Sequence, residues 1–267
     1  MINKTIYTSK EYENYIHIYP QNNPINTKRV IDITVISDLH EKHQDVYLPP
    51  GDLLLITGDM TNEGTYKEMD LLLDYLNEHS YKFRQIIAIA GNHDLTFHEE
   101  YYKNNYKRFN HDPPCDPKKI KKYFDPNNKM FYLEDSKHQY EDLKIWGTPW
   151  ITYWDEWAFS SKDETYLETK FSKIPDQVDI LMSHSPPFGV LDLFPETTKN
   201  NNKELVNIGS RSLKKRVDQV KPKLHVFGHA HYSAGWEERN GTLFVNAACL
   251  TADSKNFNKT KKVTLFL

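Results

Sequence analysis

The sequence predicts an α/β fold whose centre is a sheet of parallel strands. Residues 53–57 form a short, mostly apolar run, which is typical of a strand buried on both faces. A helical pattern over residues 65–78 and a second apolar run over 85–90 follow it, and the order strand–helix–strand implies parallel strands. Several strand-like runs, this one included, stop at Asp, Asn or His. Because open α/β sheets bind their ligands at the carboxyl ends of the strands, we expect the functional site there.

Turn residues and helix-capping residues indicate where the elements of the first half of the chain begin and end. Residues 1–28, rich in Asn, Tyr and Lys, are expected to form an extended N-terminal arm, and residues 29–37 the first strand. Thr65 and Glu68 form a capping-box pattern, which predicts a helix after the second strand. Apolar residues continue there at helical spacing: Met69, Leu72, Leu73 and Leu76. Residues 98–129 break this order, and we expect short helices and loops there, inserted at the rim.

The second half of the chain continues the alternation of strands and helices. Further strands are predicted over residues 130–133 and 143–147, both in a second sheet, and over 178–183, 223–227, 243–247 and 262–267. A capping box at Ser161 and Glu164 predicts one helix, and Ser210 is expected to cap another. Residues 196–204 are polar and are predicted to be a loop. No internal repeat or linker-like segment divides the chain, so residues 1–267 are predicted to form a single domain.

Two stretches outside the strands could contact a substrate. A lysine cluster lies in the rim insertion: Lys118, Lys119, Lys121 and Lys122. It could attract a phosphate, but clustered charge is more often a solvated helix face. Residues 149–159 hold Trp150, Trp154 and Trp157. Such an aromatic stretch usually packs in the core, and the alternative is the wall of a substrate pocket, for which Trp150 and Trp154 are the candidate contacts.

The composition excludes several classes of protein. The 267 residues carry a formal net charge of −3, without the excess of Lys and Arg that marks a dedicated nucleic-acid surface. Two distant cysteines, Cys115 and Cys249, make no disulfide framework and indicate a reducing compartment. Residues 1–10 contain no apolar signal-peptide core, and no apolar run reaches the ~20 residues that span a bilayer. We therefore expect a cytoplasmic protein with no membrane partner, and a homodimer is compatible with the sequence.

The residues that follow the strand-like runs are metal-ligand types. Seven of them offer carboxylate, amide or imidazole donors and no thiolate: Asp38, His40, Asp59, Asn92, His184, His229 and His231. This mixture suits divalent first-row transition metals better than Ca²⁺, which takes all-oxygen cages. Seven donors exceed what one catalytic ion with an open position requires. Two ions that share a bridging carboxylate would use them all, and such pairs catalyse phosphoryl transfer. His225 lies within a strand and is expected to be a core residue.

The order of these blocks resembles the calcineurin-like metallophosphoesterase superfamily. The five blocks are Asp38-Leu39-His40, Gly58-Asp59, Gly91-Asn92-His93-Asp94, Ser183-His184 and Gly228-His229-Ala230-His231. Finer features are similar to one subgroup, the class III cyclic-nucleotide phosphodiesterase-like and brain metallophosphoesterase-domain proteins. Among these features are Gly147-Thr148-Pro149-Trp150 and His184-Ser185-Pro186-Pro187. The resemblance implies a four-layer α/β/β/α sandwich of two mixed sheets.

The resemblance also implies a role for each residue of the site. One metal would be bound by Asp38, His40 and His231, the other by Asn92, His184 and His229, and Asp59 would bridge them. His93 would bind no metal, but would sit over the scissile phosphate and stabilise charge or protonate the leaving oxygen. A metal-bound hydroxide would be the nucleophile. Asp94 would orient His93 or a ligand, the alternative being a helix N-cap. Mn²⁺ is the expected metal, with Fe, Zn, Co and Ni as alternatives.

The function implied by the resemblance is that of a dinuclear-metal phosphodiesterase acting on cyclic nucleotides or other small phosphodiesters. The alternatives are a phosphomonoesterase and a non-catalytic scaffold of the same fold, although a complete ligand set with His93 weighs against the scaffold. Other branches fit less well. Residues 60–64 replace the Arg-containing block of Ser/Thr protein phosphatases, and Asn62 stands where purple acid phosphatases have a metal-binding Tyr. Ser185 and the segment 98–129 depart from the nearer subgroup and bear on substrate choice.

Overall fold

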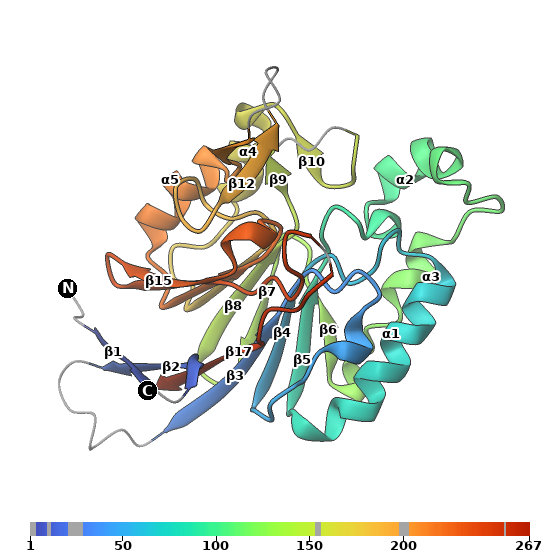
Figure 1. The fold of residues 1–267 in the computed structure, drawn as a ribbon. Coiled ribbons are helices and arrows are strands. Elements are labelled where there is room, and N and C mark those ends of the chain that lie inside the picture. The colour runs from blue at the N-terminus through green and yellow to red at the C-terminus, as the bar shows by residue number, and fades with distance from the viewer. Residues whose placement is uncertain (1–3, 10–11, 21–28, 153–155, 198–202, 254) are drawn as a thin grey trace.

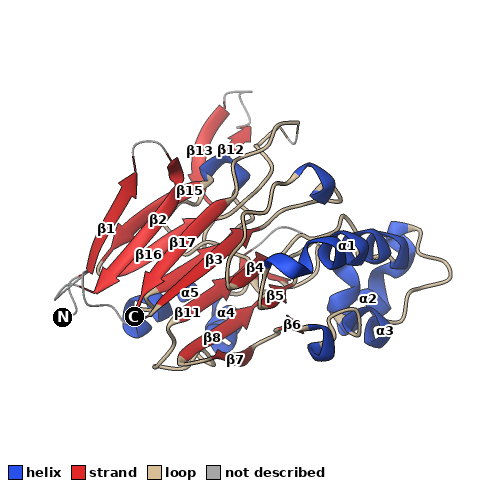
Figure 2. Cartoon of the chain, turned by 90° about the horizontal axis from the view of Figure 1, so that it is seen from below, coloured by secondary structure: helices blue, strands red, loops and turns tan. Residues whose placement is uncertain are grey.

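Two large mixed sheets pack face to face, and helices cover their outer faces, as Figure 1 and Figure 2 show. This is the four-layer α/β/β/α arrangement that the resemblance implies. The computed structural model of the chain describes residues 4–9, 12–20, 29–152, 156–197, 203–253 and 255–267.

The first sheet has seven strands, and the four neighbouring strands at one end of it run parallel. In spatial order the seven are β1 (Lys4–Ser9), β2 (Tyr12–Pro20), β17 (Lys261–Phe266), β3 (Val30–Ile36), β4 (Leu53–Thr57), β5 (Gln85–Ile89) and β6 (Met130–Tyr132). Strands β3 to β6 are parallel, whereas β17 pairs antiparallel with β3. Strands β1 and β2 are antiparallel to each other, and β2 pairs with β17. The described part of the N-terminal arm therefore extends this sheet.

The second sheet has six strands and a parallel centre. In spatial order they are β15 (Gly235–Arg239), β16 (Thr242–Asn246), β14 (Leu224–Phe227), β11 (Ile180–Ser183), β8 (Leu143–Thr148) and β7 (Ser136–Tyr140). The edge strands β15 and β7 run antiparallel to their neighbours. Two short pairs lie outside both sheets: β9 (Ile151–Thr152) with β10 (Ser160–Ser161), and β12 (Leu193–Thr197) with β13 (Lys203–Asn207).

The helices form the two outer layers. In Figure 1, α1 (Tyr66–His79), α2 (Glu99–Asn105) and α3 (Pro117–Lys121) lie on the side of the first sheet, and α4 (Glu164–Phe171) and α5 (Arg211–Val220) on the other side. The capping box of Thr65 and Glu68 is present at the start of α1, and the Ser210 hydroxyl accepts a hydrogen bond at the start of α5, as predicted. None of the helices in the described ranges is long and apolar enough to cross a membrane.

The apolar run of β4 is buried on both faces because a layer covers each of them. Leu53 and Leu55 belong to the core between the two sheets, together with Ile180 and Leu224 of the second sheet. Leu54 belongs to the outer core, which includes the apolar face of α1. All five residues of β4 are buried, so its sequence shows no alternation of polar and apolar residues. Truncating one such Leu to Ala typically costs about 2–5 kcal/mol of unfolding free energy.

Three predictions about individual elements are wrong. Residues 130–133 were expected in the second sheet, but β6 pairs with β5 in the first, because a short apolar run does not specify its partner strand. Residues 196–204 were expected to be a loop, but strands β12 and β13 extend into both ends of this segment, with 198–202 outside the described residues. The hairpin is largely exposed, so it lacks the apolar signal of a strand. Asp163, and not Ser161, caps α4.

Candidate metal centre

The carboxyl ends of five strands bring the predicted ligands into one cluster. Strands β3, β4 and β5 are followed by Asp38, His40, Asp59 and Asn92, and strands β11 and β14 by His184, His229 and His231. Two sets of three residues have donor atoms within 4.8 Å of one another: Asp38, His40 and His231, and Asp59, His184 and His229. A third set, of His40, Asp59 and His93, overlaps the other two. Both sheets therefore contribute to the same site.

Asp59 belongs to the second set and also lies within reach of His40, a member of the first. Its Oδ2 is 3.3 Å from Nε2 of His184 and 3.7 Å from Nε2 of His40. Oδ1 of Asn92 lies 3.1 Å from Nε2 of His184, so the amide oxygen joins the second set. One carboxylate within reach of both groups of histidines has the position that a bridging ligand requires.

The backbone has an unusual conformation at four of these residues. Their φ angles are positive: Asp38 (55°), His40 (43°), Asp59 (49°) and His229 (66°). This region costs of order 1–3 kcal/mol for a residue other than glycine and persists only where the surroundings fix it. Here Asp38 N donates to Gly58 O at 3.0 Å, and Leu39 N donates to Asp59 O at 2.8 Å. His229 N also donates to both carboxylate oxygens of Asp38, each at 3.0 Å. Backbone strain of this kind clusters at functional sites.

Two glycines of the motif blocks leave room for ligand oxygens. A Cβ atom on Gly91 would lie closer than 3.0 Å to Oδ1 of Asp59, and one on Gly228 would lie closer than 3.0 Å to Oδ2 of Asp38. Real Cβ atoms essentially never make such contacts. Both carboxylates thus occupy space that the side chain of any residue larger than glycine, placed at position 91 or 228, would fill.

Backbone carbonyls orient two histidines of the site. Nδ1 of His184 lies 2.7 Å from Thr57 O, so the ring donates its Nδ1–H there and turns Nε2 toward Asp59. Nδ1 of His93 lies 3.0 Å from Asn62 O, while the backbone N–H of His93 donates to Oδ1 of Asp59 at 2.8 Å. Such partners fix the tautomer and direction of an imidazole ligand or acid.

The two carboxylates of the site stay ionised, which favours the binding of a cation. Burial opposes the ionisation of Asp38, but the ring of His231, 3.1 Å from its Oδ1, contributes to a pKa lowered to about 2. Burial likewise opposes the ionisation of Asp59, whose pKa is held well below its usual value by His184. Burial lowers the pKa of His40 to about 4. Against the effect of burial, Asp59 raises the pKa of His184 to about 9, so a bound cation would displace a proton there.

Asp94 holds two ligand-bearing loops together. Its buried carboxylate accepts hydrogen bonds from the N–H of Gly91 at 2.8 Å, from the N–H of Thr61 at 3.0 Å and from the Thr61 hydroxyl at 2.7 Å. Burial and the neighbouring charge of Asp59 raise its pKa to about 6. It is the N-cap residue of the short helical turn Leu95–Phe97, but its side chain makes no capping hydrogen bond there, and it does not line the cavity. Its carboxylate therefore joins the loop after β4 to the loop after β5, and its role in orienting His93 or a ligand stays a prediction.

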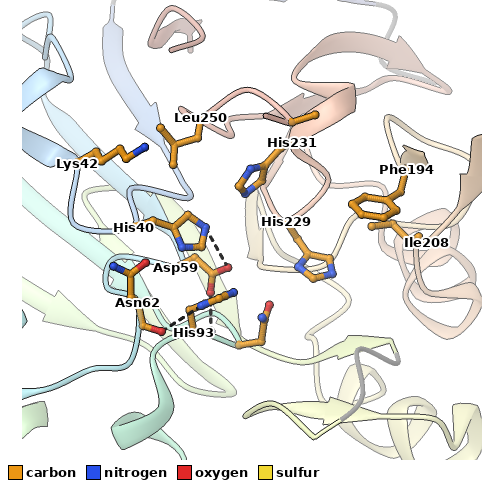
Figure 3. Close-up of a pocket in the computed structure, with 12 residues that line it drawn as sticks. His40, Lys42, Asp59, Asn62, His93, Phe194, Ile208, His229, His231 and Leu250 are labelled. Carbon is orange, nitrogen blue, oxygen red and sulfur yellow. Dashed lines mark hydrogen bonds and ion pairs between the residues drawn. The ribbon is translucent and has the colours of Figure 1, made fainter. Parts of the chain in front are cut away.

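An open cavity of about 490 Å³ lies over these residues (Figure 3). Besides candidate ligands, its lining includes Lys42, Asn62, His93, Phe194, Ile208, Leu250 and Ala252. The predictions from sequence missed Lys42, Phe194, Ile208 and Leu250. These residues belong to no motif and come from separate segments, so only the folded chain brings them together.

The tryptophans differ in their relation to the cavity. The predicted contact Trp150 is 5% exposed, and its indole N–H donates to Asp135 at 2.8 Å. It is a core residue and does not line the cavity, so the expectation of a substrate wall is wrong for it. Trp154 lies outside the described residues. Trp157 contacts the ring of His93, with ring centroids 4.1 Å apart.

The rim insertion, residues 98–129, supports the loop that orients His93. It forms short helices and loops, as predicted. Within it, Nε2 of His111 lies 2.9 Å from the carboxylate of Glu63, and Nδ1 lies 2.9 Å from the Tyr102 hydroxyl. Glu63 adjoins Asn62, whose carbonyl contacts His93. The lysine cluster of this insertion does not line the cavity, in agreement with a solvated helix face.

His225, expected in the core, is fully buried in β14. Its Nε2 lies 2.8 Å from the Ser183 hydroxyl, and burial lowers its pKa to about 3. It belongs to none of the donor sets found among the described residues.

Comparison with known proteins places this site in a family. Residues 31–233 match the family model described as calcineurin-like phosphoesterase. The chain is 32% identical over 228 residues to human metallophosphoesterase domain-containing protein 1, covering 84% of this chain and 67% of that protein. It is 34% identical over 218 residues to a UPF0046 protein of Caenorhabditis elegans, covering 80% and 73%.

A solved structure, that of the Thermus thermophilus protein TT1561, has a similar fold, with a TM-score of 0.51 at 13% identity over 82% of this chain and 89% of that one. At this identity the likeness supports the fold alone. The matched family segment spans more than half of the chain and contains all seven candidate ligands. The protein therefore belongs to the calcineurin-like phosphoesterase family.

Proposed function

We propose that the protein is a dinuclear metal-dependent phosphodiesterase that hydrolyses cyclic nucleotides or other small phosphodiesters. The observation that carries the proposal is the position of Asp59, which belongs to one donor set and lies 3.7 Å from His40 of the other, in one open cavity with His93 beside it. Paired metal sites of this kind support in-line displacement at phosphorus.

The residues fit two divalent transition ions. The donors are oxygen and imidazole nitrogen, and glycines leave the space that the two carboxylates occupy. Asp38, His40 and His231 would hold one ion, Asn92, His184 and His229 the other, and Asp59 both. Mn²⁺ is the proposed metal, and Fe, Zn, Co and Ni have similar ligand preferences. When bound, the ions would supply Lewis acidity toward the phosphoryl group and the attacking water.

His93 is the residue that we assign to the leaving oxygen. Its Nδ1–H is engaged by Asn62 O, so Nε2 is the position that can hold a proton for transfer. The ring of Trp157 packs against the imidazole, with the ring centroids 4.1 Å apart. The backbone N–H of His93 is tied to Asp59, which keeps the acid at a fixed place relative to the bridging carboxylate.

A diester is proposed over a monoester because the cavity has few cations. A monoester dianion carries one more negative charge than a diester and gains from additional Arg or Lys donors. Among the described lining residues, Lys42 is the sole Lys or Arg. Lys42 is also the observation that favours the alternative, a phosphomonoesterase, and the experiment below separates the two.

The test compares kcat/KM for bis-p-nitrophenyl phosphate and for p-nitrophenyl phosphate at neutral pH with Mn²⁺, followed by a panel of cyclic nucleotides. We expect the diester to be the better substrate and at least slow turnover of a cyclic nucleotide. A clear preference for the monoester, with no cleavage of cyclic nucleotides, would favour the phosphomonoesterase. Hydrolysis of neither ester by the metal-loaded protein would favour the scaffold.

A further inference from the structure

One flank of the cavity is apolar and lies apart from the polar ring of candidate ligands. Phe194 and Ile208 form this flank, and both are half-buried. In Figure 3 they lie together beyond His229, whereas Lys42 and Leu250 lie on the other side of the site, near His40. A substituent on phosphorus that extends past His229 would meet carbon atoms, and one that extends the other way would meet an ammonium group.

The apolar flank is held on a fixed support. Phe194 lies in β12 and Ile208 directly after β13, so both belong to the hairpin that stands outside the two sheets. At its base, the buried carboxylate of Asp192 accepts hydrogen bonds from the N–H of Gly189 at 2.9 Å and of Gly209 at 3.0 Å, and from the Asn207 amide at 2.6 Å. A buried carboxylate with three donors fixes the loops that it joins.

The hairpin presents different residues on its two faces. Phe194 lies opposite Val206, and Pro195 opposite Leu205. Since side chains alternate along a strand, Leu205 lies on the face opposite to Phe194, where it is 49% exposed. Leu205 does not line the cavity. It is therefore a matched control for any substitution of Phe194.

We propose that Phe194 and Ile208 form the binding surface for a planar apolar substituent of the substrate, an aryl group or a nucleobase, on the ester oxygen that is not cleaved. The assignment to the retained ester follows from the location of the pair beyond His229, because His93 is the residue assigned to the leaving oxygen. An aromatic ring gains both from burial of apolar area and from its contact with the Phe194 ring. This inference rests on the proposed function and specifies its substrate class.

The first experiment compares two diesters with the same leaving group, phenyl p-nitrophenyl phosphate and methyl p-nitrophenyl phosphate, on the Mn²⁺-loaded protein. We expect kcat/KM for the phenyl ester to exceed that for the methyl ester by about fivefold to thirtyfold, as expected for burying one ring. Phe194→Ala should bring this ratio close to one, and Leu205→Ala should leave it as in the wild type. A wild-type ratio near one, or a ratio that survives Phe194→Ala, would overturn the proposal.

The second experiment does not depend on turnover. Calorimetry measures the Kd of phenylphosphonate and of methylphosphonate for the Mn²⁺-loaded protein and for both variants. Tighter binding of phenylphosphonate, lost in Phe194→Ala but kept in Leu205→Ala, supports the apolar surface even if neither diester is hydrolysed, in which case only the proposed activity fails. Equal binding of the two phosphonates by the wild type would reject the surface, whatever the activity.

Discussion

The ring of candidate ligands and the apolar flank face the same cavity but are built in different ways. The ligands follow buried parallel strands of both sheets, and four of them have a positive φ that neighbouring hydrogen bonds fix. The flank stands on a two-stranded hairpin outside the sheets, with half-buried side chains. In the ring, the ligand carboxylates contact glycines so closely that a larger side chain would not fit. The side chains of the flank are partly exposed to solvent, so a larger side chain has room there. We infer that the ring of ligands determines which reaction is catalysed. Substitutions in the flank can alter which substrate is bound without disturbing the ligands.

The largest effect is expected for Asp59→Asn, in the centre of the ring. An amide is neutral and a weaker metal ligand, and this one side chain lies within reach of histidines from both donor sets. We expect a fall in kcat of at least about 10³-fold, as for loss of an essential catalytic charge, together with loss of bound Mn²⁺ measured by elemental analysis. Asp38→Asn, which alters one donor set only, is the comparison and should retain about one ion. If Asp59→Asn keeps both ions and full rate, Asp59 is not the bridge.

A smaller or similar fall in rate is expected for His93→Ala, which lies beside the ring of ligands. Loss of a positioned acid typically lowers the rate by about 10²–10⁴-fold. Since His93 is assigned to the leaving oxygen, the variant should keep its Mn²⁺ content and its thermal midpoint. His231→Ala, the same truncation at a predicted ligand, should lose metal. Loss of metal in His93→Ala would instead identify it as a ligand, in line with the third donor set of His40, Asp59 and His93.

The smallest effect is expected on stability, when a glycine beside the ring and a glycine beside the flank are each replaced by alanine. A Cβ at Gly228 would collide with Ser37 and with the Asp38 carboxylate, whereas one at Gly189, at the base of the hairpin, meets no atom within 4 Å. Gly228→Ala should therefore cost at least about 1–3 kcal/mol through overpacking. Gly189→Ala should cost only about 1 kcal/mol through its positive φ. Denaturant unfolding without metal measures both.

Mn²⁺ titration of the same two variants tests whether the collision reaches the site. Gly228→Ala should bind Mn²⁺ more weakly, because its Cβ would displace the Asp38 carboxylate, and Gly189→Ala should bind it normally. Equal losses of stability and equal Mn²⁺ affinity in the two variants would show that the ring is no more tightly constrained than the flank.

Elements with strong local signals were predicted well. The limits of β4 agree with residues 53–57, and α1 starts at the Thr65 capping box. Two of the failures share a cause, which is that the deciding contact is distant in the chain. Residues 130–133 pair with β5 only after the rim insertion returns the chain to the first sheet. Trp150 lies in the core, where its ring contacts those of His98 and Phe159 and its indole N–H donates to Asp135.

The single-domain organisation, the cytoplasmic location, the lack of a nucleic-acid surface and the compatibility with a homodimer stay predictions. Each of them concerns the whole protein and its surroundings, whereas the described contacts concern the fold and the cavity. Sedimentation of the full chain would measure its oligomeric state.

By itself, the sequence determined the α/β class, the order of most strands and the identity of the residues at their carboxyl ends. It could do so because each ligand directly follows the apolar strand that carries it, so one short segment holds both the signal and the side chain. Only the tertiary structure decided that Phe194 and Ile208 face the site, that Trp150 does not, and that Asp94 braces the loops on either side of it. Those positions depend on packing between segments far apart in the chain, for which no local pattern of residues exists.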